Sequence, residues 1–368
     1  MTTGVLFGGP SPEHDISILT GLQALRELRR ARRDAIGLYW TKTGEFAAVP
    51  DDVEAAGFVD GVPAGSSALT LRLGDRGGFE SAAGRLGRAR SLDLDVVVVA
   101  THGGPGEDGS LQAALDLAGL AYTGPSVAGA ALGMDKWAFA AVVAAAGLPT
   151  LPRALLDADT TSLPFDGPYI LKPRFGGSSI GIDVVADLAT ARARLVTNVH
   201  LARGCVVEPF RADLDDVQIA VRTYPRLALS SIERPLRRSA GAEILDYRDK
   251  YVGGEGMVSA PRELPAVLGP GQADAVEGAA RVIAEAASVR GVARIDYLVG
   301  RDELYVNEIN TIPGSLSKHL FVAPPLAFLE LLDDLIGEAL ARPAHLYSAA
   351  GADGVVLRSA GAIAAKLA

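Results

Sequence analysis

The residue types best suited to chemistry gather towards the C-terminal end of the chain. Two apolar runs, 295–299 and 303–306, flank a Gly-Arg-Asp turn and predict a β-hairpin. Asp296 lies on the first strand of this hairpin, and Glu308 and Asn310 follow the second. Residues two apart in an extended segment point the same way, so we expect Glu308 and Asn310 to face the side that Asp296 faces.

Three oxygen-bearing side chains on one face of a sheet would suit Mg²⁺. This hard cation usually shares its coordination shell with waters and substrate phosphates. The turn Thr311-Ile312-Pro313-Gly314 then leads the chain away, and Gly314 has no side chain to keep a reacting atom from its backbone N–H. The alternative interpretation is a polar strand end that closes with a Pro-Gly turn.

The composition excludes several classes of protein. The chain has 368 residues, of which 49% are hydrophobic, enough to bury two or three domain cores. Its net charge of −9 argues against nucleic acid as a partner. The single cysteine, Cys205, excludes a disulfide framework and a cysteine-based zinc site. The sequence shows neither a signal peptide nor an uncharged apolar run of membrane length, which predicts a cytoplasmic protein with no membrane partner.

The N-terminal segment predicts the first βα unit of a doubly wound sheet. Apolar residues at 5–7 form an expected strand, and a glycine turn follows at 8–15. Apolar residues then repeat at helical spacing, at positions 16, 19, 22, 25 and 28. Ligands of such sheets bind beyond the carboxyl ends of the strands, so Glu13 is aimed at the binding crevice. The alternative role for Glu13 is that of a favourable partner of the helix dipole.

A second glycine-rich loop, 101–109, follows the clearest buried parallel strand, 94–100. It contains a formal G-x-G-x-x-G pattern before a predicted helix at 110–118. We discount a dinucleotide site, because no acidic residue ends a strand about twenty positions later to hold a ribose. The remaining interpretation is a tight loop whose polar groups contact a small substrate. A strand at 35–40 and a surface loop with a possible hairpin at 61–90 are also expected.

The middle of the chain carries the candidate phosphate-binding elements. Asp135 is expected to cap a helix at 136–146. Lys136 lies in the first turn of this helix, where a positive charge interacts unfavourably with the helix dipole, and a nearby anion would offset that cost. Lys172 projects inward from a strand, and the loop 174–182 that follows is rich in glycine and serine. This loop lacks the Lys-Ser/Thr end of a P-loop, but its backbone N–H groups can lie over phosphates as a flap. The alternative is an exposed hairpin tip.

The rest of the chain completes a predicted α/β protein. A strand at 206–210 ends in an acid and an aromatic residue, an edge that can hold a planar base through backbone contacts. The glycine-rich segment 234–261 is long enough to be a lid or disordered. The other expected elements are a strand at 216–221, amphipathic helices at 272–287 and 328–340, and a tail from 345 with no assigned role.

Seven ordered motifs resemble those of the D-alanine:D-alanine ligase family. They are GGPSPEHDIS, HGGPGEDGSLQ, GMDK, LKPRFGGSSIG, DYRDKY, ARID and NEINTIPG, and the resemblance covers residues 4–335. It implies an ATP-grasp carboxylate-amine ligase of three α/β domains, with ATP held between two antiparallel sheets. The implied units are an N-terminal Rossmann-like substrate-binding domain at 1–124, a central ATP-grasp subdomain with the glycine-serine flap at 125–207, a C-terminal ATP-grasp subdomain with the metal and catalytic residues at 208–343, and a tail at 344–368.

The resemblance also implies a reaction. In this family ATP phosphorylates the carboxylate of a first amino acid, and the amine of a second attacks the acyl phosphate, so that ADP and phosphate are released. The implied cofactors are ATP and two Mg²⁺ ions, with Mn²⁺ as a possible substitute. The implied partners are small-molecule amino-acid substrates and a second copy of the chain in a homodimer.

Site residues follow from the same resemblance, position by position. The implied metal ligands are Asp296, Glu308 and Asn310. The implied ATP-binding residues are Lys136, Lys172, Gly177, Ser179, Glu208, Phe210, Asp216 and the lid residue Lys250. The implied catalytic residues are Glu13, Ser178, Arg294, Tyr251 and Gly314. The implied substrate-binding residues are His102 beside the donor, and His319 and Leu320 at the acceptor.

The catalytic residues divide into two groups by their implied roles. Glu13 would bind the donor ammonium and, with Ser178 and Tyr251, latch the lid so that water cannot consume the acyl phosphate. Arg294 and the N–H of Gly314 would stabilise the tetrahedral oxyanion, a role worth about 3–4 kcal/mol per donor.

Four positions depart from the family pattern. Asp216 stands where a ribose-binding Glu is usual, Pro209 occupies a hinge without its N–H, and Leu245 replaces a lid Tyr. The largest departure is His319, which stands where the family has a serine that binds the acceptor carboxylate. An imidazole is bulkier than a hydroxyl and can be cationic, which raises the hypothesis of an acceptor other than D-alanine. Tyr251 favours an amine acceptor.

Three functions stay open at this point. The first is a D-alanine:D-alanine ligase that serves peptidoglycan synthesis in the cell wall. The second is a dipeptide ligase of specialised metabolism, built on the same scaffold, with another acceptor. The third is a nucleotide-binding protein without ligase activity, against which the presence of every inferred ATP- and metal-binding residue type argues.

Overall fold

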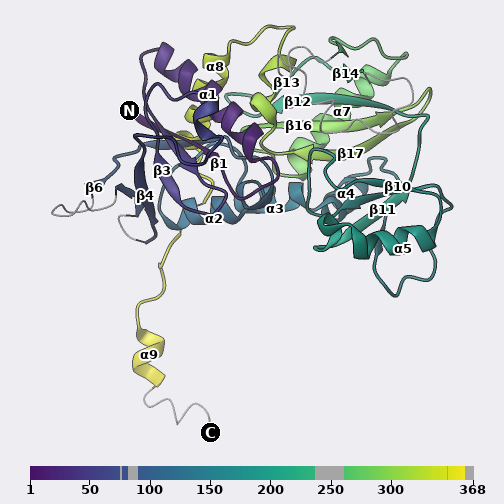
Figure 1. The fold of residues 1–368 in the computed structure, drawn as a ribbon, viewed down its shortest axis with the longest axis horizontal. Helices are drawn as coiled ribbons and strands as arrows, with labels where there is room; N and C mark the ends of the chain where they lie inside the picture. The colour runs from purple at the N-terminus through teal and green to yellow at the C-terminus, as the bar shows by residue number, and fades with distance from the viewer. Residues whose placement is uncertain (75–76, 82–89, 237–260, 346, 361–368) are drawn as a thin grey trace.

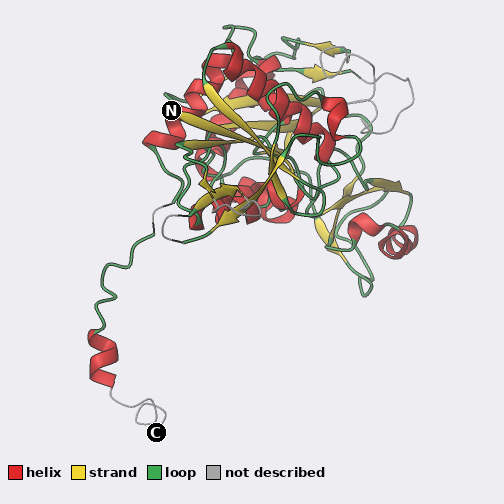
Figure 2. Cartoon of the chain, turned by 60° about the vertical axis from the view of Figure 1, so that its left-hand side comes forward, coloured by secondary structure: helices red, strands yellow, loops and turns green. Residues whose placement is uncertain are grey.

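The structure is a computed structural model that describes residues 1–74, 77–81, 90–236, 261–345 and 347–360. Its helices and strands form an α/β protein with three main sheets that follow one another along the chain (Figure 1). This confirms the fold class predicted from the sequence. After the last helix of the body the chain leads away to the short helix α9 (Val355–Ala360), as both overall views show (Figure 2).

The first sheet has seven strands in the order β6-β5-β4-β3-β2-β1-β7. Its centre is the predicted parallel unit, since β1 (Thr2–Gly8) pairs in parallel with β2 (Asp34–Trp40) and β7 (Val96–Val99). The remaining strands are antiparallel and are β3 (Phe46–Ala48), β4 (Ser67–Arg72), β5 (Gly78–Ser81) and β6 (Arg90–Ser91). The hairpin expected within 61–90 is present, since β4 pairs with β5, but it extends the sheet instead of lying in a surface loop, because Leu69 and Phe79 bury their side chains in the core.

Helices cover this sheet from distant parts of the chain. α1 (His14–Arg30) packs on β1 and β2, with the predicted apolar face buried except at Leu19, which is 46% exposed while Ile18 is buried. α8 (Phe328–Ala341) packs on β7 and α1, so the last helix of the body completes the N-terminal hydrophobic core (Figure 1). The other helical segments here are η1 (Ala55–Phe58), η2 (Gly104–Gly106) and α2 (Ser110–Leu117).

The second sheet has four antiparallel strands in the order β10-β9-β11-β8. They are β8 (Ala154–Leu156), β9 (Tyr169–Pro173), β10 (Asp183–Val185) and β11 (Cys205–Pro209). The helical segments around them are α3 (Val127–Met134), α4 (Lys136–Ala145), α5 (Leu188–Thr197) and η3 (Val199–Leu201). Asp135 caps α4 as predicted, since its carboxylate accepts hydrogen bonds from the backbone N–H groups of Trp137 and Ala138. The helix α3 was not expected.

The third sheet is also antiparallel, with the order β13-β12-β16-β17. Its strands are β12 (Asp215–Arg222), β13 (Ala228–Leu229), β16 (Val292–Val299) and β17 (Leu304–Asn310). The amphipathic helix α7 (Gln272–Ala286) packs on β12 and β17 and buries a separate hydrophobic cluster. β14 (Arg234–Pro235) pairs with β15 (Arg262–Glu263), so the two ends of the predicted lid lie together, while residues 237–260 lie outside the described residues.

Each of the three sheets can be compared with one of the three predicted domains. They occupy residues 2–99, 154–209 and 215–310. The boundary predicted after residue 207 falls inside β11, and the division into domains stays a prediction. No single helix in the described ranges is long and apolar enough to cross a membrane; the pair α3 and α4, bent by 100°, meets that requirement only when both are counted together.

Two helical glycines offer a test of how tightly the first core is packed. A Cβ atom at Gly21 would lie 2.4 Å from Phe7, whereas one at Gly278 on α7 would meet nothing within 4 Å. We predict that Gly21→Ala lowers the free energy of unfolding by about 1–3 kcal/mol through overpacking. The control, Gly278→Ala, should raise it by about 0.5–1 kcal/mol through helix propensity. Denaturant unfolding measures both, and a Gly21→Ala protein as stable as the wild type would contradict this packing.

Candidate active site

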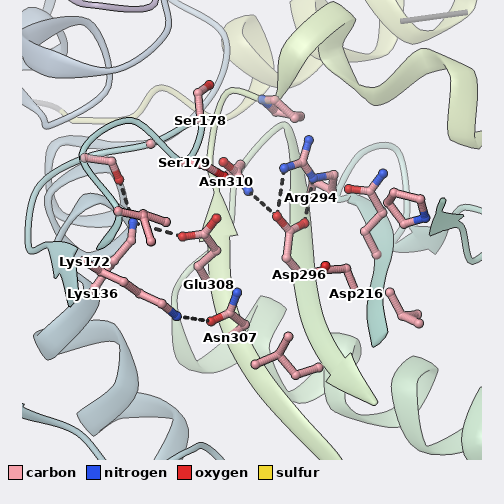
Figure 3. Close-up of a pocket in the computed structure, with 18 of the residues that line it drawn as sticks. Lys136, Lys172, Ser178, Ser179, Asp216, Arg294, Asp296, Asn307, Glu308 and Asn310 are labelled. Atoms are coloured by element: carbon pink, nitrogen blue, oxygen red, sulfur yellow. Dashed lines mark hydrogen bonds and ion pairs between the residues drawn. The ribbon is translucent and has the colours of Figure 1, made fainter. Parts of the chain in front are cut away.

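One large pocket collects side chains from the second and third sheets (Figure 3), and Glu13, His102 and Glu107 reach it from the turns that follow β1 and β7. The residues that line it include most of those predicted from the sequence, namely Glu13, His102, Lys136, Lys172, Gly177, Ser178, Ser179, Glu208, Phe210, Asp216, Arg294, Asp296, Glu308, Asn310, Gly314 and His319. Leu320 does not line the pocket, because its side chain is fully buried in the core. Lys250, Tyr251 and Leu245 lie outside the described residues.

The predicted hairpin of β16 and β17 places its polar residues on one face. Asp296 pairs with Glu308, and Arg294 pairs with Asn310, in the antiparallel register. Cross-strand partners share a face of the sheet, so the expected grouping of Asp296, Glu308 and Asn310 is confirmed. The amide of Asn310 donates a hydrogen bond to Asp296 at 3.1 Å, and Arg294 binds both carboxylate oxygens of Asp296, at 2.6 and 2.8 Å. β17 runs on to Asn310 instead of ending before Glu308.

A β-bulge in this hairpin adds a residue that the sequence did not reveal. The register shifts between Asp296, which faces Glu308, and Tyr297, which faces Val306, so Asn307 is the extra residue. A bulge breaks the strict alternation of side chains and can re-aim one of them. Asn307 and Glu308 consequently both point from β17 towards the second sheet (Figure 3).

The two predicted lysines meet these residues. Lys136 Nζ lies 2.9 Å from a carboxylate oxygen of Glu308 and donates to the carbonyl of Gly176 at 2.6 Å. Glu308 is therefore the anion expected near the first turn of α4. Lys172 Nζ donates to Asn307 Oδ1 at 2.9 Å and to Glu208 at 2.7 Å. Each lysine ties the second part of the chain to β17.

Glu208 is buried between two cations. Its side chain is fully buried, Lys172 binds one oxygen, and Arg153 Nε lies 2.5 Å from the other. Burial alone would raise the pKa of Glu208, but the charges of Lys172 and Arg153 outweigh it and hold that pKa below its usual value. Arg153 also donates to the backbone carbonyls of Lys136 and Asn307. The sequence analysis missed Arg153, which stands in an apolar strand context without a motif.

Glu13 contacts the glycine-serine loop, as a residue aimed at the crevice should. The hydroxyl of Ser178 donates a hydrogen bond to the carboxylate of Glu13. A Cβ atom at Gly103 would lie 2.3 Å from Glu13, and one at Gly177 would lie 2.9 Å from it. A Cβ atom at either position would crowd the carboxylate where it now lies, so two glycine-rich loops meet around Glu13. The base of the loop is fixed separately, because Arg174 pairs with both oxygens of Asp135.

A buried glutamate, Glu107, was also missed, although it stands inside the glycine-rich loop 101–109. One oxygen accepts the N–H of Ile312 at 3.0 Å, and the other accepts the N–H of Gly103 at 3.0 Å. Burial and then the nearby charge of Glu13 raise the pKa of Glu107 to about 7. The sequence did contain a signal for Glu107, namely an acidic residue between glycines in a loop that follows a buried strand.

At the other end of the pocket, His319 pairs with a buried acid. Its Nε2 lies 3.3 Å from Glu233, which also binds Gln218 at 2.7 Å and Arg262 at 3.3 Å. Burial raises the pKa of Glu233, but His319, Arg262 and Gln218 together bring it below its usual value. The Nδ1 atom of His319 is buried and has no hydrogen-bond partner among the described residues. None of Glu233, Gln218 and Arg262 was predicted.

The oxygen atoms of Asp296, Glu308 and Asn310 fit a hard divalent cation. No group of three or more His, Cys, Asp or Glu side chains gathers as a metal cage in the described part of the chain. A cation at this face would therefore have two carboxylates and an amide oxygen from the protein. That set leaves coordination positions for water and phosphate, which is how Mg²⁺ is usually held.

Known proteins match this chain along nearly its whole length. The family described as D-ala D-ala ligase N-terminus matches residues 2–125, and the family described as D-ala D-ala ligase C-terminus matches residues 131–336. A D-alanine–D-alanine ligase of Bradyrhizobium is 31% identical over 363 residues, and the match covers 93% of this chain and 96% of the relative. One of Nocardia farcinica is 32% identical over 355 residues, and that match covers 92% of this chain and 96% of the relative. The crystal structure of D-alanine–D-alanine ligase from Helicobacter pylori superposes with a TM-score of 0.73 at 24% identity, covering 94% of this chain and all of that one.

The raised pKa of Glu107 predicts a pH dependence of stability. Since about 7 lies above the ordinary value of 4.5, the folded protein keeps a proton that the unfolded protein releases. This stabilisation is fully present below pH 4.5 and is lost as the pH rises through about 7, with a total of about 3 kcal/mol. Glu107→Gln, which does not titrate, should flatten this fall when unfolding is measured from pH 5 to pH 8. The exposed control Glu285→Gln should keep the wild-type profile, and an unchanged profile in Glu107→Gln would contradict the assignment.

Proposed function

The chain belongs to the D-alanine–D-alanine ligase family of ATP-dependent ligases, and we propose that it joins two amino acids into a dipeptide with D-alanine as the donor. Its ATP-grasp fold and N-terminal domain are those of the family. The observation that supports the proposal best is the pocket in which Lys136 and Lys172 lie opposite the oxygen ligands of β16 and β17. Cations for phosphates and carboxylates for a metal meet there.

The proposed reaction has two steps. A carboxylate oxygen of the donor first attacks the γ-phosphorus of ATP, the bond from that phosphorus to the bridging oxygen breaks, and ADP leaves. The amine of the acceptor then attacks the acyl carbon, a C–N bond forms, and the C–O bond to phosphate breaks. The amine loses one proton, and phosphate leaves. Phosphoryl transfer of this kind needs mainly positioning and neutralisation of charge.

The lysines and acids of the pocket would supply that neutralisation. We assign phosphate binding to Lys136 and Lys172, both of which are buried and already hold acceptor atoms on β17. Asp296, Glu308 and Asn310 would hold Mg²⁺, which supplies charge neutralisation on the phosphoryl oxygens when it is bound. Gly177, Ser179, Glu208, Phe210 and Asp216 line the same pocket, which supports their assignment to the nucleotide.

The donor and the oxyanion have separate groups in this proposal. Glu13 would bind the donor ammonium, and its bond to Ser178 supports a latch between the N-terminal sheet and the flap. Arg294 and the N–H of Gly314 would stabilise the tetrahedral oxyanion of the second step, and both residues line the pocket. The roles of Lys250 and Tyr251 in the lid rest on the family resemblance alone.

The acceptor is the finer question. D-Alanine is the first candidate, because the donor-side and nucleotide-side motifs are those of the family. A dipeptide ligase with another acceptor is the second, and the pairing of His319 with Glu233 at the acceptor end favours it. We place the protein in the cytoplasm as a homodimer, on the family resemblance.

The first experiment is ADP release by the purified protein with Mg-ATP and D-alanine, followed by a panel of D- and L-amino acid pairs with products identified by mass. D-alanyl-D-alanine at a useful rate would establish the first candidate. Turnover only with a mixed pair would establish the second, and no ADP release with any pair would refute the proposal.

The metal and oxyanion roles predict the effect of two substitutions. Glu308→Gln or Arg294→Ala should lower kcat by at least about 100-fold, the loss seen when one charge-stabilising group is removed from an active site. The melting temperature should show that both variants are folded. Glu285→Gln and Arg281→Ala, which change exposed residues of α7, are the matched controls. Near-normal activity in either test variant would mean that this face of the hairpin is not the active site.

His319 predicts a change of selectivity. If the imidazole lines the acceptor pocket and selects another acceptor, His319→Ser should shift the product panel towards D-alanine as the acceptor. His345→Ser, which changes an exposed histidine near the tail, should leave the panel unchanged. Equal acceptor selectivity in His319→Ser and the wild type would remove His319 from the acceptor pocket.

A further inference from the structure

A chain of three hydrogen bonds, two of them buried and one partly buried, ties the turn after β17 to the N-terminal part of the protein. Nδ1 of His102 lies 2.7 Å from the carbonyl oxygen of Ile312, and Nε2 lies 2.8 Å from the hydroxyl of Thr20 on α1. The same hydroxyl accepts the N–H of Ser315 at 3.1 Å. Thr20 is 1% exposed and His102 is 3% exposed, so water does not compete for these bonds. Thr20 does not line the pocket.

The chemistry of the groups sets the direction of each bond. A carbonyl can only accept, so Nδ1 of His102 carries a hydrogen. Burial lowers the pKa of His102 to about 4, and the ring is neutral at pH 7 with a bare Nε2. The hydroxyl of Thr20 therefore donates to Nε2 and keeps its lone pairs for the N–H of Ser315. Both ring nitrogens of His102 thus bind other groups of the protein. The predicted hydrogen bond from His102 to a substrate would require one of these two bonds to break, and it stays a prediction.

The turn that these bonds hold has an unfavourable backbone. Ser315, Leu316 and Ser317 have φ values of 48°, 51° and 51°. The left-handed region costs a non-glycine residue about 1–2 kcal/mol, and it persists only where the surroundings impose it. The bond from the N–H of Ser315 to Thr20 is made at the first of the three residues.

Gly314 lies between two anchored residues. On one side, Ile312 donates its N–H to Glu107 and accepts from His102. On the other side, Ser315 donates to Thr20. The two residues between them, Pro313 and Gly314, cannot shift their backbone without straining one of these bonds. The position of the Gly314 N–H in the pocket consequently depends on Thr20 of α1, although Thr20 itself does not line the pocket.

We propose that Thr20 is a positioning residue of the ligase reaction, whose hydroxyl, joined to His102 and Ser315, holds the Gly314 N–H where the tetrahedral oxyanion forms. The inference rests on the proposed function, because it concerns the step in which the acceptor amine attacks the acyl carbon. It adds a residue of the first helix to a site whose other described groups, Leu320 excepted, line the pocket. A group that acts only by placing another should affect the rate of one step and not the binding of ATP.

The test compares Thr20→Val, which keeps the branched shape and loses the hydroxyl, with Thr20→Ser, which keeps the hydroxyl. We expect Thr20→Val to lower kcat for dipeptide formation by about 10- to 100-fold, the scale of an ångström of misplacement, without a matching change in the KM for ATP. Thr20→Ser should retain most of the wild-type kcat. Wild-type turnover is established first by the substrate panel described above, so a failure at this stage concerns Thr20 alone.

A second readout separates the two steps. With ATP labelled by heavy oxygen in the bridge between the β- and γ-phosphorus, reversible transfer of the phosphoryl group to the donor carboxylate moves label into non-bridging β positions. This exchange does not require attack by an acceptor amine. Thr20→Val should scramble the label near the wild-type rate, because Gly314 acts in the later step. A merely structural role for Thr20 would slow both steps together.

Several results would overturn the proposal. They are an unchanged kcat in Thr20→Val, equal losses in the Val and Ser variants, and a slowing of label scrambling equal to the loss of dipeptide formation. Thr20→Ala serves as a second hydroxyl-free variant that cannot clash in the core. If both hydroxyl-free variants lose the fold, as judged by melting temperature, Thr20 serves stability and the proposal fails.

Discussion

The charged side chains at the centre of the pocket are paired with one another, and the rest of the site depends on this pairing. Removing a charge from water costs several kcal/mol, and a paired partner offsets this only with good geometry. Lys136 pairs with Glu308, and Arg294 pairs with Asp296. The Lys136–Glu308 pair joins α4 to β17, so it also holds the second part of the chain against the third sheet. Arg294 and Asp296 both lie on β16. The groups that would neutralise ATP and its metal are therefore the groups that hold the pocket together.

The N-terminal part of the chain contributes placement more than charge. Glu13 reaches the flap through Ser178 because two glycines leave room for its carboxylate. Glu107 and His102 hold the turn after β17 by its backbone, from inside a core that excludes water. A ligase that forms a water-sensitive acyl phosphate needs reacting groups that stay in place while solvent is kept out. Buried hydrogen bonds to the backbone serve both needs.

The two ends of the pocket differ in how closely they follow the family. The nucleotide end carries the lysines, acids and flap that the family motifs imply, and all of the described ones line one pocket. The proposed acceptor end carries His319, which stands where the family has a serine and which pairs with the buried Glu233. In the proposed function, activation of the donor and choice of the acceptor would use different ends of one pocket.

The sequence by itself determined the local elements and the family. Helical spacing predicted α1, α7 and α8, a capping aspartate predicted the start of α4, and alternating apolar runs predicted the hairpin of β16 and β17. These signals are local, because a cap or a periodicity involves residues within a few positions of one another. The order of seven motifs was enough to indicate the ligase family, since motif order does not require knowledge of distances.

Only the tertiary structure decided which distant residues meet. The bulge that turns Asn307 towards Lys172 depends on how two strands pair, and one of the two cations that bind Glu208 is Arg153, which no motif marks. Thr20 and Ser315 are 295 positions apart in the sequence and share one hydrogen bond. A buried polar group must find a partner wherever the packing of the whole chain brings one, and a sequence pattern carries no record of that packing.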